Sequence, residues 1–156
     1  MNRRGLFLSF GLLLLTACST PRPPASSAPR AVENRHDVVI LAMAMLDRNY
    51  TYGGKKLHTG FDCSGLVSFV YRESVGMSLK GSSADMARQT RAVDASQVQP
   101  GDLVFFNTLG SSYSHVGIYI GSGQFIHAEN EKTGVKTSNL KSGYWARRFE
   151  GYRSVF

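Results

Sequence analysis

Cys63 is the residue in this sequence best suited to covalent chemistry. The chain has two cysteines, and the other, Cys18, lies in an N-terminal segment that looks like an export signal. Asp62 is a good helix N-cap and apolar residues recur at helical spacing after Cys63, so we expect the thiol in the first turn of a helix. Backbone N–H groups and the helix dipole favour the nucleophilic thiolate there. The alternative is a buried cysteine that acts as a small hydrophobic residue.

Two histidines on neighbouring predicted strands supply the groups that such a nucleophile needs. His115, Gly117 and Tyr119 alternate onto one strand face, which we expect to look toward the cysteine helix, with Gly117 leaving room beside the imidazole. His127 on the next strand can bond one nitrogen of His115 and orient that residue as a general base. A strand histidine taken singly is more often only a satisfied polar residue, so the hypothesis depends on the combination with Cys63.

Zinc binding is a second interpretation of the same three side chains, because thiolate and imidazole are both good zinc ligands. The chain has no close ligand pair such as Cys-x-x-Cys, which zinc sites usually contain. We therefore predict no metal and no other cofactor for the group formed by Cys63, His115 and His127.

The elements that must hold these residues follow two periodicities. Apolar residues recur at helical spacing in the first part of the domain, and Ser82 with Asp85 forms a capping-box pattern. After the turn-forming residues 99–102 the pattern changes to that of strands. Helices followed by strands indicate an α+β domain with an antiparallel sheet. The predicted helices are 35–48, 63–75 and 84–90, and the predicted strands are 103–106, 115–120, 125–128 and, at the edges, 135–138 and 152–156.

The N-terminus has the layout of a lipoprotein signal. Arg3 and Arg4 precede an apolar stretch too short to span a bilayer, and the stretch ends in Leu-Thr-Ala-Cys, which resembles the lipobox of bacterial lipoproteins. We expect residues 1–17 to be removed and Cys18 to carry a lipid, with an ordinary secretory signal as the alternative. Ser19 fits sorting to an outer membrane, facing the periplasm, in a host with two membranes.

A change in composition separates a tether from the folded domain. Residues 18–33 are rich in Pro, Ser, Ala and Arg and cannot bury a core, so we expect a flexible tether. Residues 34–156 form one predicted domain of ordinary size. Removal of the signal takes Arg3 and Arg4 with it, so the formal net charge falls from +7 to +5 (+7 minus 2). This positive balance suits an acidic polymer such as a cell wall, and a solvated basic surface without a partner is at least as good an interpretation. No basic run alternates with aromatic residues, so we predict no nucleic-acid partner.

Five short motifs follow one another through nearly the whole predicted domain. They are Tyr-Thr-Tyr-Gly-Gly at 50–54, Phe-Asp-Cys-Ser-Gly-Leu-Val at 61–67, Pro-Gly-Asp-Leu-Val-Phe-Phe at 100–106, His-Val-Gly-Ile-Tyr at 115–119 and Phe-Ile-His-Ala at 125–128. In order and spacing the set resembles the NlpC-type cell-wall cysteine peptidases, a family that includes lipoproteins. The resemblance implies a papain-like fold, with N-terminal helices packed on a central antiparallel sheet of about five to six strands.

The same resemblance implies a reaction. A Cys-His-His triad falls on Cys63, His115 and His127, and the family hydrolyses peptidoglycan stem peptides, typically between D-glutamate and the diamino acid at the third position. The thiolate attacks the amide carbonyl, protonated His115 donates a proton to the leaving amine, and water hydrolyses the thioester. The partners implied are peptidoglycan or muropeptides, and the membrane through lipidated Cys18.

Three further residues receive roles from the resemblance. The Tyr50 hydroxyl would join the backbone N–H of Cys63 as a donor to the oxyanion, and simple packing of the aromatic ring is the alternative. Asp62 and Ser64, which flank the nucleophile, would bind substrate, although the cap role already explains Asp62. The competing function is a catalytically silent, membrane-tethered wall-binding or scaffold protein of the same fold.

Overall fold

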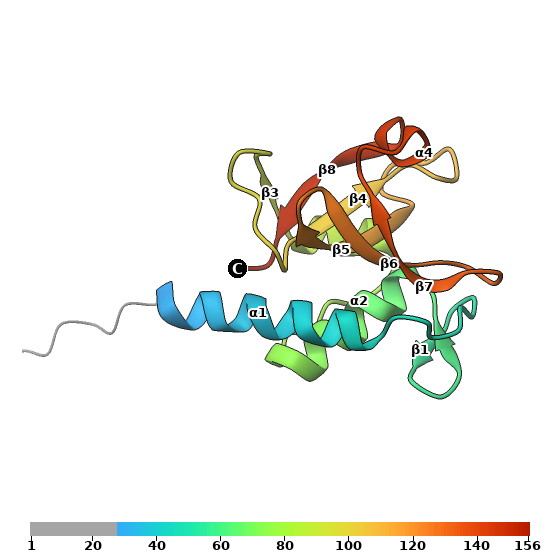
Figure 1. Cartoon of the computed structure of the whole chain (residues 1–156), viewed down its shortest axis with the longest axis horizontal. Coiled ribbons are helices and arrows are strands. Elements are labelled where there is room, and N and C mark those ends of the chain that lie inside the picture. The colour runs from blue at the N-terminus through green and yellow to red at the C-terminus, as the bar shows by residue number, and fades with distance from the viewer. Residues whose placement is uncertain (1–27) are drawn as a thin grey trace, which may run out of the picture.

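Four helices and eight strands make up residues 28–156, the part of the chain that the computed structural model describes (Figure 1). The predicted signal, Cys18 and most of the predicted tether lie outside the described residues. Within the described part, no helix has the length and apolar character needed to cross a membrane. The elements are α1 (Ala28–Ala44), β1 (Lys55–Lys56), β2 (Gly60–Phe61), α2 (Cys63–Val75), α3 (Ser83–Gln89), β3 (Arg91–Val93), β4 (Leu103–Phe106), β5 (His115–Gly121), β6 (Gln124–Asn130), β7 (Gly134–Asn139), α4 (Gly143–Ala146) and β8 (Phe149–Ser154).

A six-stranded antiparallel sheet forms the centre of the domain, in the order β3-β8-β4-β5-β6-β7. The helices α1 and α2 pack on one face of this sheet, and the short α4 packs on the other (Figure 1). The strands β1 and β2 pair separately, beside the start of α2. This arrangement confirms the predicted α+β fold with its antiparallel sheet.

The last strand is where the predicted sheet was wrong. β8 begins at Phe149, three residues before the predicted start, and it lies between β3 and β4 instead of at an edge. The strand at this edge is β3, which the sequence pattern did not predict. Its three residues are mostly exposed and show no apolar alternation, and they form a strand because they pair with β8. Position in a sheet depends on tertiary pairing, which a local pattern does not encode.

The first helix differs from its predicted bounds at both ends. α1 already includes residues 28–33, which were predicted as tether, and Pro29 is tolerated there because N–H groups in the first turn have no helical partner. The helix stops short of the predicted Arg48, because Asp47 adopts a positive φ of 63° and the chain turns toward β7. The Arg48 carbonyl then accepts from the N–H of Val135, and the Asp47 N–H donates to the Val135 carbonyl.

The ends of α2 and α3 follow the local signals in the sequence. Asp62 is the N-cap of α2 and its Oδ1 accepts from the Gly65 N–H at 2.6 Å, while Gly76 ends the helix in the left-handed region with a φ of 68°. Ser82 and Asp85 form the predicted capping box of α3. The cap on α2 fixes Cys63 as the first helical residue, which positions the thiol.

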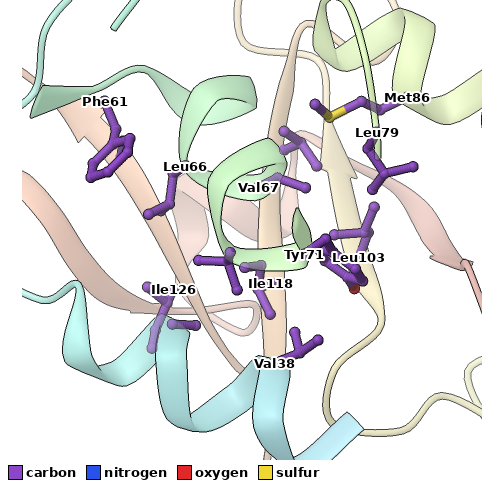
Figure 2. Close-up of a cluster of buried hydrophobic side chains, with 14 of the residues drawn as sticks. Val38, Phe61, Leu66, Val67, Tyr71, Leu79, Met86, Leu103, Ile118 and Ile126 are labelled. Atoms are coloured by element: carbon purple, nitrogen blue, oxygen red, sulfur yellow. The ribbon is translucent and has the colours of Figure 1, made fainter. Parts of the chain in front are cut away.

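The main core lies between α1, α2 and the sheet (Figure 2). Its side chains are almost fully buried, and each large aliphatic contributes roughly 1.5–3 kcal/mol by leaving water. A second cluster on the opposite face of the sheet contains Val104, Phe106, Phe125 and Trp145. Central strands are therefore buried on both faces. Members of the main core include Val38, Phe61, Leu66, Val67, Tyr71, Leu79, Met86, Leu103, Ile118 and Ile126.

Candidate active site

Cys63 is half-buried at the first turn of α2 and contacts the main core. Backbone N–H groups of Val116, Ser64 and Cys63 itself act on its sulfur and favour the thiolate. Val116 directly follows His115 in β5, so the sulfur lies beside the start of that strand. The fold thus brings the predicted nucleophile and the backbone next to the predicted base into one region.

The surroundings of Cys63 nevertheless shift the pKa of its thiol upward overall. Burial raises its pKa to about 11, and the negative charge of Asp62 acts in the same direction. The neighbouring N–H groups oppose this shift without overcoming it. The net shift favours the thiol over the thiolate in the free protein, so in this state the proton leaves as the sulfur reacts; the role of Cys63 as nucleophile stays a prediction.

His115 and His127 form a hydrogen-bonded chain that ends at Ser138. His115 Nε2 lies 2.8 Å from His127 Nδ1, and His127 Nε2 lies 2.9 Å from the Ser138 hydroxyl on β7. His127 is fully buried and His115 is 7% exposed. The remaining ring nitrogen of His115 is Nδ1, the atom that is free to exchange a proton with a thiol.

Both imidazoles are neutral at physiological pH. Burial lowers the pKa of His115 to about 4. Burial also lowers the pKa of His127 well below its usual value, and positive charge on His115 and Lys136 acts in the same direction. A neutral imidazole next to a protonated thiol is equipped to act as a general base.

Trp145 of α4 covers the two histidines. Its ring stacks on His115 with centroids 5.3 Å apart and an interplanar angle of 30°, and it meets His127 edge-on at 4.7 Å. The side chain is only 6% exposed, so it keeps solvent off this side of the imidazole pair. The sequence offered one signal for this role, since Trp145 is the only tryptophan in the chain.

The predicted orientation of the histidine strand was wrong. His115 and Tyr119 do share a face, but that face packs against the second cluster, while Val116 points into the core beneath the helices. Gly117 makes room for β6 instead of α2, because a Cβ there would lie 2.7 Å from the Phe125 ring. The thiol therefore approaches at the end of the strand and not across its face.

Asp62 and Ser64 are held in the cap of α2. Asp62 Oδ1 accepts from the Gly65 N–H and from the Ser64 hydroxyl at 3.0 Å, and Oδ2 accepts from the Gly53 N–H at 3.0 Å. These bonds join the cap to the turn that precedes β1. They account structurally for both residues, and the substrate-binding roles of Asp62 and Ser64 stay predictions.

Tyr50 is half-buried and packs against the main core near the nucleophile. Burial raises the pKa of its hydroxyl, and the negative charge of Asp62 acts in the same direction. Tyr50 also lines a cavity, so its protonated hydroxyl can donate to a ligand there. Its predicted role toward an oxyanion is compatible with this position and stays a prediction.

Two cavities flank this region and meet at Asn130. The first, here called the His115 pocket, has a volume of about 470 Å³ and is lined by His115, Glu129, Asn130 and Tyr144 among others. The second, here called the Tyr50 pocket, has a volume of about 480 Å³ and is lined by Tyr50, Asn130, Glu131 and Lys132. Because Asn130 lines both, the two pockets together can receive an extended ligand.

The alternative of a metal site is tested by the arrangement of ligand side chains in the described residues. Across residues 28–156, no group of three or more His, Cys, Asp or Glu side chains is arranged to hold an ion. The arrangement present is a thiol with a hydrogen-bonded imidazole pair. Such a set can perform nucleophilic substitution at a carbonyl.

Comparison with known families places this geometry in context. The profile of the NlpC/P60 family matches residues 47–154. The chain is 44% identical over 110 residues to a probable endopeptidase p60 of Listeria grayi, covering 70% of this chain and 20% of that protein. It is 35% identical over 116 residues to murein DD-endopeptidase MepH of Escherichia coli (strain K12), covering 72% and 43%. It is 38% identical over 105 residues to gamma-DL-glutamyl hydrolase of Bacillus subtilis (strain 168), covering 67% and 25%.

A solved structure shares the fold. The crystal structure of an NLP/P60 family protein, described as similar to lipoprotein, from Staphylococcus aureus subsp. aureus Mu50 matches with a TM-score of 0.70 and 30% identity. The match covers 91% of this chain and 45% of that one. The chain spans less than half the length of each of these relatives. The likeness confirms the predicted papain-like α+β fold.

Proposed function

The chain belongs to the NlpC/P60 family, which includes cysteine peptidases, and we propose that it is a peptidoglycan endopeptidase. In this proposal Cys63 is the nucleophile, His115 its general base and His127 the residue that orients His115. The bond broken is an amide in a cell-wall stem peptide, and a thioester is the intermediate.

One observation supports this proposal most directly, namely the hydrogen-bonded chain from His115 through His127 to Ser138 beside the start of β5. A relay of this kind holds Nε2 of the first imidazole and orients the ring, which leaves Nδ1 as the nitrogen available to a thiol. The Val116 N–H acts on the sulfur of Cys63, so thiol and relay belong to one site. A scaffold protein without activity would have no need of this largely buried polar chain.

The protonation states support a definite order of events. Neutral His115 accepts the thiol proton on Nδ1 while the sulfur of Cys63 attacks the carbonyl carbon. The oxyanion accepts hydrogen bonds from the Cys63 backbone N–H and the Tyr50 hydroxyl. Protonated His115 then gives its proton to the leaving amine as the C–N bond breaks. Water, deprotonated by His115, hydrolyses the thioester and restores the thiol.

We propose that the enzyme hydrolyses the bond that joins D-glutamate to the diamino acid. One relative is named a murein DD-endopeptidase and another a gamma-DL-glutamyl hydrolase, so the names of the relatives do not single out one bond. In peptidoglycan, cleavage of a DD cross-link and cleavage of the bond to D-glutamate each release an amino group of the diamino acid. Mass spectrometry of the soluble products released from purified peptidoglycan distinguishes the two, and Cys63→Ala provides the inactive control. Binding to the wall without any product would favour the scaffold alternative.

We also propose that the protein is lipid-anchored through Cys18 and held at the outer membrane, facing the periplasm. This part is supported by the sequence alone, through the basic start, the short apolar stretch and the Leu-Thr-Ala-Cys segment that ends in Cys18. The Pro-rich residues between Cys18 and α1 would give the domain reach toward the wall.

A further inference from the structure

The two pockets beside the site differ in what they can receive. The group that leaves in amide hydrolysis is an amine, and it takes its proton from the general acid, which is His115 in the proposed mechanism. His115 lines the first pocket, whereas Tyr50, the proposed oxyanion donor, lines the second. The amine component of the substrate therefore belongs in the His115 pocket and the acyl component in the Tyr50 pocket.

The His115 pocket carries one ionised side chain, the carboxylate of Glu129. Its Oε2 accepts from the Thr133 hydroxyl at 2.7 Å and lies 3.6 Å from Lys136 Nζ. Both contacts use the same oxygen, and among residues 28–156 no hydrogen bond reaches Oε1. The Glu129 side chain is 22% exposed, so the carboxylate is accessible to a ligand but partly shielded from water. A single free carboxylate oxygen in a cavity is suited to a cationic group.

We propose that Glu129 binds the free side-chain ammonium of the diamino acid in the leaving component, an inference that rests on the proposed function. A stem peptide that is not cross-linked carries this ammonium, whereas a cross-linked one has it converted to an amide. Glu129 would thus select uncross-linked stem peptides. The same preference favours the bond to D-glutamate, because cleavage of a DD cross-link leaves the other amino group acylated by D-glutamate.

The size of the effect follows from the exposure of the pair. A charge pair at a partly exposed site is worth up to about 1 kcal/mol, or roughly fivefold in kcat/KM. Lys136 opposes an ammonium ligand, since its own ammonium already lies near Oε2. Removal of Lys136 should therefore raise the preference for the free amine, whereas removal of Glu129 should abolish it.

The test compares two substrates that differ at that amine, which is charged in one and acetylated in the other. They are L-alanyl-γ-D-glutamyl-meso-diaminopimelate and the same tripeptide acetylated on the side-chain amine, assayed as kcat/KM. We expect the full chain to prefer the free amine roughly fivefold, Glu129→Gln to show no preference, and Lys136→Met to show a larger one. Glu131→Gln, which alters the Tyr50 pocket, is the matched control and should retain the preference.

Two outcomes would overturn the inference. Equal kcat/KM for both peptides in the wild type, or an unchanged preference in Glu129→Gln, would remove Glu129 from substrate selection while leaving the peptidase intact. Absence of hydrolysis of both peptides would refute the proposed D-glutamyl bond specificity alone. In that case calorimetric binding of the two peptides to Cys63→Ala tests the ammonium site separately, and equal affinities would overturn it.

Discussion

Replacing Ser138 with alanine tests whether the relay behind His115 sets its protonation. His127 has two neutral tautomers, and only one leaves Nδ1 of His115 unprotonated. In that tautomer His127 Nε2–H donates to Ser138, and His127 Nδ1 accepts from His115 Nε2–H. In the other, His127 donates to His115 Nε2, and the single proton of His115 then sits on Nδ1, where it blocks base catalysis.

The expected magnitude follows from the burial of His127. Its ring is fully buried, so Ser138→Ala leaves Nε2 without a partner, at a cost of about 1–3 kcal/mol for an unsatisfied buried polar group. The productive tautomer loses the acceptor of its Nε2–H and is destabilised by up to that amount. We therefore expect kcat to fall about tenfold or more, since 1.4 kcal/mol corresponds to a factor of ten. KM should change little, because Ser138 lines neither pocket.

The assay is steady-state hydrolysis of a stem peptide, together with ¹⁵N NMR of the histidine side chains to read the tautomers. Ser138→Thr keeps the hydroxyl and should restore most of the rate and the tautomer signature. Thr137→Ala, one residue away and on the other face of β7, is the control for strand stability. Wild-type kcat in Ser138→Ala, or equal losses in Ser138→Ala and Ser138→Thr, would refute the reasoning.

Three other perturbations test separate parts of the account. Gly65→Ala should lower the free energy of unfolding by about 2 kcal/mol or more in denaturant titration, because its Cβ would overlap the Gly54 carbonyl; a loss below about 0.5 kcal/mol would contradict this packing. Since burial holds the pKa of His115 near 4 and that of Cys63 near 11, kcat/KM should stay flat from about pH 5 to 9 and fall only as His115 becomes protonated; an acid limb centred near 6.5 would argue against a buried neutral base. Cys18→Ala should move the protein from the membrane to the soluble fraction, and unchanged fractionation would exclude the lipid anchor.

Local signals predicted the part of the site that depends on one helix. Asp62 and Gly76 mark the ends of α2 through cap geometry that needs only neighbouring residues, so the position of Cys63 followed from the sequence. The pairing of His115 with His127 also followed, because a short hairpin turn fixes the register of β5 and β6. These features are local, and local chemistry determines them.

Features that depend on tertiary contacts could not be predicted from the sequence. The face that His115 presents was predicted wrongly, because central strands are buried on both sides and alternation then does not show which side the helices cover. Ser138 was assigned to a strand, but its contact with His127 depends on the register between β6 and β7. Trp145 lies on a helix of only four residues, too short to produce a periodic pattern.

Hydrolysis of purified peptidoglycan by Cys63→Ala tests the central claim most directly, with release of soluble stem-peptide fragments measured beside the wild type. The thiol is half-buried and caps no other group, so the variant should keep the wild-type circular dichroism spectrum. We predict release by the wild type and none above background by the variant. Release by the variant at the wild-type rate would contradict the assignment of Cys63 as the nucleophile.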